Sequence, residues 1–177
     1  PYDPLEAFEP IARVGEAPML LVMAPDRGPK TVAELAAALK KEPAKWTFGA
    51  AALGAPGHLA TIAFKVATGA NATILPYRGT APALNDVAGG HIQLLIDPVL
   101  ALLPMAQEKK VVGLAVTSAK RTRLAPEIPT IAESGLAGFD HASWYGLWGP
   151  KSMAPELVAT LNQMFNKSLK QLDSEGR

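Results

Sequence analysis

The chain contains no cysteine, no long hydrophobic run and almost no net charge, and each absence removes a class of function. Without cysteine there is no disulfide, no thiolate metal site and no cysteine nucleophile. No stretch reaches the roughly 20 apolar residues that a membrane-spanning helix needs. The densest segment, 92–105, is interrupted by Asp97, Pro98 and Pro104. The formal net charge is +1 and no basic face forms, so the sequence argues against nucleic-acid binding.

The remaining composition is that of a globular protein. The 177 residues are 49% hydrophobic and 19% charged, which is enough material for one domain or two small lobes. The chain opens at Pro1 with neither a methionine nor a signal peptide. We therefore expect a mature form, a cloned fragment or a truncated product.

Strand-like and helix-like segments alternate along the first two thirds of the chain. Strands are predicted at 14–24, 46–50, 72–77, 92–96 and 111–117, and helices at 31–41, 59–68, 80–89 and 98–110. This order predicts an α/β fold with a mainly parallel sheet and helices on both of its faces. An aromatic-rich strand at 139–148 and a helix from Pro155 follow, and we expect them to belong to another lobe, separate from this sheet.

Two helices carry apolar stripes that need a partner surface. In the helix 59–68 we expect the stripe to face the sheet, and its members are Leu59, Ile62, Ala63, Val66 and Ala67. In the C-terminal helix we expect coverage by pieces of that other lobe that are not in this chain, and the stripe consists of Leu157, Leu161, Met164, Phe165 and Leu172.

Groups suited to a small polar ligand follow three of the predicted strands. Ligands of open parallel sheets bind beyond the carboxyl ends of strands, and a loop that opens a helix exposes N–H groups to an anion. We therefore predict one concave site for a small anion. Its predicted residues are Gly49, Ala50, Ala51, Ala52, Leu53, Gly54, Ala55, Gly57, His58, Thr80, Ala81 and Asp97.

Each part of this site has an alternative structural explanation. The Gly/Ala loop is also typical of close packing between a strand and a helix. Thr80 is equally suited to be the N-cap of the helix 80–89, and Asp97 to cap the helix that follows it.

Catalytic and metal-binding patterns are weak. The three histidines, His58, His91 and His141, have no partner at metal-ligand spacing. A triad of Ser143, His58 and Asp97 lacks the G-x-S-x-G elbow, and no nucleotide fingerprint is present. We predict no metal, no cofactor and no enzymatic activity.

Four blocks of the sequence together resemble one known family. Residues 1–22, PYDPLEAFEPIARVGEAPMLLV, are similar to PYDPxxDFxPVARVGxxPxVLV, and FGAAALGAPGHLA at 48–60 is similar to YGSAGxGSxxHLA. The block 76–97 resembles PYKGxAPAxxDLxGGxVxxMFD, and 114–150 resembles LAVTSxxRxxxLPDVPTxxEAGxPGFExxSWxGLxAP. These are motifs of the tripartite tricarboxylate transporter substrate-binding family, also called Bug receptors.

The resemblance implies a two-lobed, type II periplasmic binding-protein fold whose second lobe is complete and whose first lobe is partial. Residues 1–24 would be a first-lobe remnant with a crossover strand, 25–136 the second lobe, and 137–177 the return strand and a first-lobe helix. It also implies a periplasmic receptor that captures a small carboxylate and delivers it to membrane transporter subunits. The ligand loop of the family maps onto Gly49 to His58, with Thr80, Ala81 and Asp97 beside it.

The sequence departs from the family pattern in two ways. Nothing corresponds to the upstream first-lobe segment with its PGGxxD loop, so we expect a cleft with one wall. Within the retained loop, Ala50 and Ala55 replace serines, Ala52 replaces a frequent glycine, and Leu53 stands where a polar residue is common. Each lost hydroxyl removes a hydrogen bond worth ~0.5–1.5 kcal/mol. We therefore expect weaker binding, or an aromatic or partly apolar carboxylate as ligand.

Three functional hypotheses follow from the sequence. The leading one is a carboxylate receptor or a truncated form of one. The second is a truncated remnant that binds nothing and forms a homodimer through its incomplete lobe. The third and weakest is a hydrolase that uses His58.

Overall fold

A computed structural model describes residues 2–175 of the chain. The chain separates into two compact units. Unit 1 comprises residues 1–16 and 144–177, and unit 2 comprises residues 17–143. The units are described separately below.

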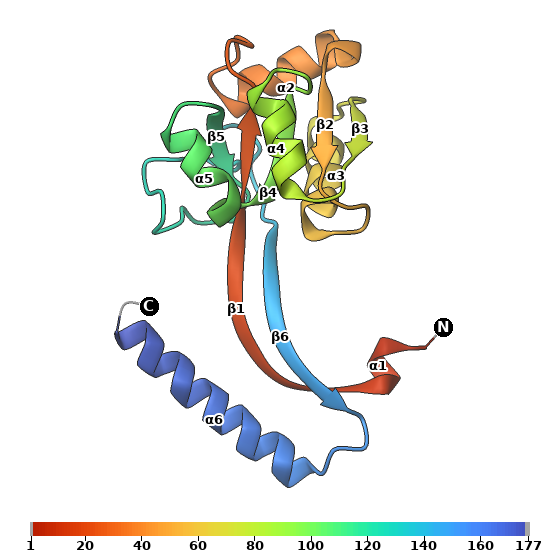
Figure 1. Ribbon diagram of the computed structural model, residues 1–177, viewed down its shortest axis with the longest axis vertical. Coiled ribbons are helices and arrows are strands. Elements are labelled where there is room, and N and C mark those ends of the chain that lie inside the picture. The colour runs from red at the N-terminus through yellow and green to blue at the C-terminus, as the bar shows by residue number, and fades with distance from the viewer. Residues whose placement is uncertain (1, 176–177) are drawn as a thin grey trace. The chain divides into compact units, whose positions relative to one another are not determined.

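Every strand and helix that the alternation predicts is present, with bounds shifted by a few residues (Figure 1). The strands are β1 (Phe8–Met23), β2 (Thr47–Ala50), β3 (Thr73–Pro76), β4 (Leu94–Pro98), β5 (Val112–Val116) and β6 (Ala142–Pro150). The helices are α1 (Pro4–Ala7), α2 (Val32–Lys41), α3 (Pro56–Thr68), α4 (Thr80–Ala88), α5 (Val99–Gln107) and α6 (Pro155–Ser174), with a 3-10 turn, η1 (Pro43–Lys45). The short elements α1 and η1 were not predicted.

The sheet is mixed, with strand order β3-β2-β4-β1-β5 and β6 paired to β1. Strand β2 runs parallel to β3 and β4, as predicted, but β1 runs antiparallel to both β4 and β5. The register explains the difference, because Met23 at the end of β1 and Phe48 in β2 both pair with Leu94. Strand β1 therefore finishes at the same end of the sheet at which β2 begins. The connection through α2 brings the chain back to that end, so it does not have to run the length of the sheet as a parallel crossover would.

Helices cover both faces of the sheet, as predicted. Successive residues of β1 point to opposite faces, so its continuous apolar run is buried on both sides. One core joins β1, β2 and β4 to α2 and α3, and includes Met19, Leu21, Leu35, Phe48, Phe64 and Ile96. The other core joins β1, β4 and β5 to α4 and α5, and includes Leu20, Val22, Leu84, Leu95, Leu102 and Val116.

Helix α3 presents a different face to the sheet from the one that its apolar periodicity predicts. Val66 is 76% exposed, and the other bulky members of the predicted stripe are exposed as well. The buried residues are Gly57, Ala60, Thr61, Phe64 and Thr68. Both threonines donate their hydroxyl to a backbone carbonyl four residues earlier, at 2.7–2.8 Å. Because these hydroxyls are satisfied within the helix, the threonines pack as small apolar residues.

In unit 1, the long helix α6 is amphipathic, but none of its residues is buried. Met164 is 59% exposed, so the stripe expected to need a cover stays accessible. The rings of Trp144 and Trp148 contact each other in a tilted arrangement, with 5.4 Å between centroids, and both are about half exposed rather than part of a core. Within residues 2–175, no helix has the length and hydropathy needed to cross a membrane.

Candidate functional site

The predicted site residues meet at the edge of unit 2 where β2, β3 and β4 end. The N–H of Tyr77 donates to the carbonyl of Ala50 at 2.8 Å, and the N–H of Gly79 donates to that of Ala51 at 2.8 Å. The hydroxyl of Thr80 donates to Asp97 Oδ2 at 2.5 Å, which joins the start of α4 to the end of β4. The convergence predicted from the strand ends is therefore present in the structure.

Three helices begin at this edge, and none of them has a side-chain cap. Helix α3 follows β2, α4 follows β3 and α5 follows β4, and their N-cap residues are Ala55, Gly79 and Pro98. Helix α2, which begins elsewhere, is capped by the Thr31 hydroxyl. The first N–H groups of a helix lack partners inside the helix and carry the positive end of its dipole. This edge is therefore electrostatically suited to an anion.

Asp97 is the buried carboxylate of the site. It is 4% exposed and lies against Gly57, where a Cβ atom would come within 2.6 Å of Asp97 Oδ1. Burial raises the pKa of Asp97, and the hydrogen bond from Thr80 lowers it in part. Asp97 does not cap α5, whose N-cap is Pro98 with no side-chain bond, so that alternative is wrong. The carboxylate instead receives the Thr80 hydroxyl.

Thr80 is the first residue of α4 rather than its N-cap, which is Gly79 with a φ of 127°. The capping alternative for Thr80 is therefore wrong as well. Ala81 follows in the exposed first turn of the helix. Tyr77, at the start of the predicted strand end 77–82, donates its hydroxyl to Asp86 Oδ2 at 2.7 Å and so links the end of β3 to α4. Burial and Asp86 raise the pKa of Tyr77 to about 12.

The loop between β2 and α3 uses part of its hydrogen-bonding capacity internally. The N–H of Gly54 donates to His58 Nδ1 at 3.0 Å, and the N–H of Ala55 donates to the carbonyl of Ala52 at 3.3 Å. These two N–H groups are therefore already hydrogen-bonded within the loop. They define the shape of the loop.

The other predicted residues of the loop divide by burial. Gly49 lies inside β2, where a Cβ atom would come within 2.7 Å of Ile92 Cδ1, so close packing explains this glycine. Ala50 is also buried in the strand. Leu53, by contrast, is 66% exposed at the tip of the loop.

The proposed catalytic triad is not assembled. His58 accepts from Gly54, and Asp97 accepts from Thr80, so the two share no hydrogen bond. Among residues 2–175, no group of three or more His, Asp or Glu side chains is placed to hold a metal ion.

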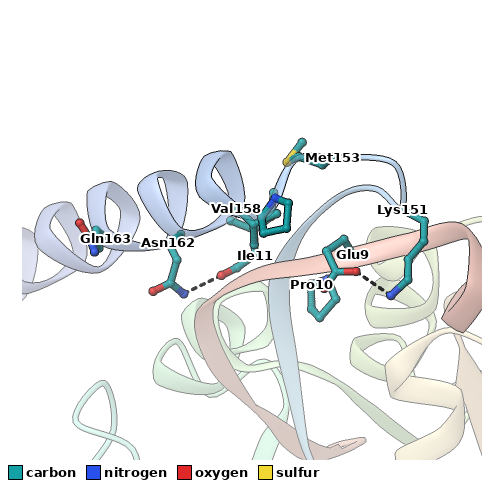
Figure 2. A pocket seen from close by; sticks show the side chains of 10 residues that line it. Glu9, Pro10, Ile11, Lys151, Met153, Val158, Asn162 and Gln163 are labelled. Carbon is teal, nitrogen blue, oxygen red and sulfur yellow. Dashed lines mark hydrogen bonds and ion pairs between the residues drawn. The ribbon is translucent and has the colours of Figure 1, made fainter.

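A separate cavity of about 490 Å³ lies in unit 1 between α6 and the start of β1 (Figure 2). Four of its lining residues interact with one another: Lys151 Nζ lies 2.6 Å from Glu9 Oε2, and the Asn162 amide donates to the carbonyl of Ile11 at 2.6 Å. None of the predicted site residues lines this cavity.

Solved structures define the class of protein. The chain is similar to the R. palustris protein Rpa4515 with adipate, with 37% identity, a TM-score of 0.81, and 93% of this chain and 55% of that one covered. It is also similar to the periplasmic binding protein BugD, with 35% identity, a TM-score of 0.78 and coverage of 97% and 60%. The fold is therefore that of periplasmic binding proteins, as predicted.

The sequence comparisons give the family. The family model described as tripartite tricarboxylate transporter family receptor matches residues 1–173, and the chain belongs to this family. Protein BugT of Bordetella pertussis is 33% identical over 169 residues, which are 96% of this chain and 52% of BugT. The chain spans about half the length of the curated relatives it matches. The family is one of receptors, which confirms the prediction that the chain is not an enzyme.

Proposed function

We propose that the chain is part of an extracytoplasmic solute-binding protein that captures a small carboxylate for a tripartite tricarboxylate-type transporter. The observation that carries the proposal is the edge of unit 2, where three uncapped helix starts meet the Thr80–Asp97 pair. Membership of a receptor family and the adipate named with the relative Rpa4515 support the same ligand class.

In this proposal unit 2 supplies one wall of the ligand site. Oxygens of the ligand carboxylate accept N–H groups from the uncapped starts of α3 and α4, including those of Gly57 and Ala81. Asp97 accepts a hydroxyl or a bridging water of the ligand through the carboxylate oxygen that Thr80 does not use. In the same proposal residues 25–136 form the second lobe, 1–24 are a first-lobe remnant with its crossover strand, and 137–177 are the return crossover strand and a first-lobe helix.

The ligand has an apolar or aromatic portion. Ala52, Leu53 and Ala55 offer no side-chain hydrogen bonds, and the exposed Leu53 gives the loop an apolar surface next to the backbone donors. Burying such a side chain against a ligand contributes about 25 cal/mol per Å² of apolar area. We therefore expect aromatic carboxylates to bind more tightly than citrate or malate.

A titration-calorimetry screen of adipate, malate, citrate and benzoate tests the proposal. We expect saturable binding that is lost in Asp97→Ala, with circular dichroism used to verify that the variant is folded. Absence of binding to every carboxylate, or full binding by folded Asp97→Ala, would contradict the proposed function. Citrate binding as tightly as benzoate would contradict the apolar preference alone.

The proposal also assigns a location and partners. Because its relative BugD is a periplasmic binding protein, we propose that the chain acts in the periplasm and meets membrane subunits of the transporter.

The second candidate is a self-associating form that binds no ligand. The accessible apolar stripe of α6 favours it, because exposed apolar stripes of this kind commonly mark protein interfaces. Size-exclusion chromatography with light scattering distinguishes the two. A dimer that binds no carboxylate supports the second candidate, and a monomer that binds one supports the receptor.

A further inference from the structure

The imidazole of His58 occupies a position at which helices commonly carry a carboxylate. His58 is the third residue of α3, and its Nδ1 accepts the N–H of Gly54, four residues earlier, at 3.0 Å. In a capping box the third helical residue is Glu or Gln, and its side chain reaches back to a backbone N–H before the helix. His58 thus makes a capping-box type of contact without a carboxylate.

Helix α2 of the same unit provides the charged version of this arrangement. Its third residue, Glu34, accepts the N–H of Lys30, also four residues earlier, at 2.7 Å. In return, the Thr31 hydroxyl accepts the N–H of Glu34 at 3.2 Å. At the corresponding positions of α3 lie Ala55 and His58, so α3 has neither the hydroxyl nor the carboxylate that caps α2.

The two changes have one electrostatic consequence. A glutamate at the start of α3 would place a negative charge beside the N–H groups and repel an incoming carboxylate. A nitrogen that accepts a hydrogen bond carries no proton, so His58 Nδ1 makes this contact only as a neutral imidazole protonated at Nε2. The helix start keeps its positive end, while the loop keeps the contact that holds it.

We propose that His58 is a positioning residue that holds the Gly54 N–H, and with it the ligand loop, without adding a second carboxylate beside Asp97 at the start of α3. The inference rests on the proposed function for its ligand and on the His58–Gly54 hydrogen bond for its geometry. It assigns to His58, whose side chain cannot be an anion as that of a glutamate can, a role in admitting anionic ligands.

Three variants separate the hydrogen bond from the charge. His58→Gln keeps a neutral acceptor, His58→Glu adds a charged one, and His58→Ala removes the acceptor. Amide hydrogen exchange of Gly54, measured by NMR without ligand, reports the contact, and calorimetry with adipate reports binding. Glu34→Gln is the matched control, because it removes a charge at the equivalent position of α2, away from the site.

We expect the amide hydrogen of Gly54 to exchange with solvent faster in His58→Ala than in the wild type. In His58→Gln and His58→Glu it should exchange at the wild-type rate. Adipate binding should persist in His58→Gln and Glu34→Gln, and should weaken by about tenfold or more in His58→Glu. Unchanged Gly54 exchange in His58→Ala would overturn the positioning role. Equal adipate affinity of the Gln and Glu variants of His58 would overturn the electrostatic one. A wild-type chain that bound no carboxylate would refute the proposed function and the ligand-selecting role with it, while the exchange rates would still decide whether His58 holds the loop.

Discussion

The close approach of α3 to β4 at Gly57 yields the sharpest prediction for the fold of the site. A Cβ atom at this position would lie 2.5 Å from the carbonyl oxygen of Ile96 and 2.6 Å from Asp97 Oδ1. Side-chain Cβ atoms essentially never approach other atoms within 3.0 Å, so Gly57→Ala forces a displacement of at least 3.0 − 2.5 = 0.5 Å. The Ile96 oxygen is part of a central strand and cannot rotate away, and Asp97 is held by Thr80.

The cost of this substitution follows from two opposing terms. Overpacking of a buried site costs about 1–3 kcal/mol, while replacing a helical glycine by alanine returns about 0.5–1 kcal/mol. With mid-range values of about 2 and 0.75 kcal/mol for these terms, we expect the free energy of unfolding to fall by about 1 kcal/mol, and the Tm to fall by about 2–4 °C for a chain of this size. Carboxylate binding should weaken in parallel, because the start of α3 is displaced from the site.

Thermal unfolding followed by circular dichroism measures the effect, with Gly15→Ala as the control. Gly15 is exposed, has no atom within 4 Å of a Cβ position and requires no positive φ. Its substitution should change the free energy of unfolding by less than about 0.5 kcal/mol. If Gly57→Ala melts within about 1 °C of the wild type, the packing of α3 on β4 described above is wrong.

Three further predictions concern the polar pair and the loop tip. Thr80→Val leaves the buried Asp97 carboxylate without its hydrogen-bond donor. Urea titration at pH 7.5 should therefore show that the free energy of unfolding falls by about 1–3 kcal/mol. An unchanged unfolding midpoint would refute the role of this hydrogen bond. Because burial raises the pKa of Asp97, its contribution to stability is complete below the unfolded pKa of about 3.9 and is lost as pH rises through the folded pKa. The stability of the wild type relative to Asp97→Asn should therefore fall with rising pH over that window, and a difference independent of pH would contradict the raised pKa. Leu53→Ser should increase the affinity for malate several-fold relative to that for benzoate in calorimetry, because a new hydrogen bond is worth about 0.5–1.5 kcal/mol. An unchanged ratio of the malate and benzoate affinities would exclude Leu53 from the site.

The sequence was sufficient to predict which segments form the sheet and where the polar groups gather. The apolar run of β1 indicated burial on both faces, and the ends of β2, β3 and β4 indicated where Thr80 and Asp97 meet. The direction of β1 was not predictable from the alternation alone. It depends on whether the connection through α2 crosses the sheet, and that is a property of the whole fold.

Side-chain hydrogen bonds within helices explain the other differences. The buried face of α3 contains Thr61 and Thr68, which periodicity counts as polar but whose hydroxyls are satisfied four residues earlier in the same helix. Thr80 and Asp97 each fit a capping role by sequence, yet they bind each other across 17 residues. The contact of His58 with Gly54 gave no recognisable signal, because a capping box is expected to carry Glu or Gln.

The central claim is that the edge of unit 2 formed by the starts of α3 and α4 binds a carboxylate. An NMR titration of the chain with adipate and with benzoate tests it most directly, because each backbone amide reports separately. The account predicts saturable shifts concentrated at the amides of residues 51–55, 57–58 and 80–81, with smaller changes elsewhere. Saturable shifts confined to α6 and the unit 1 cavity, or no saturable shift with any carboxylate, would contradict it.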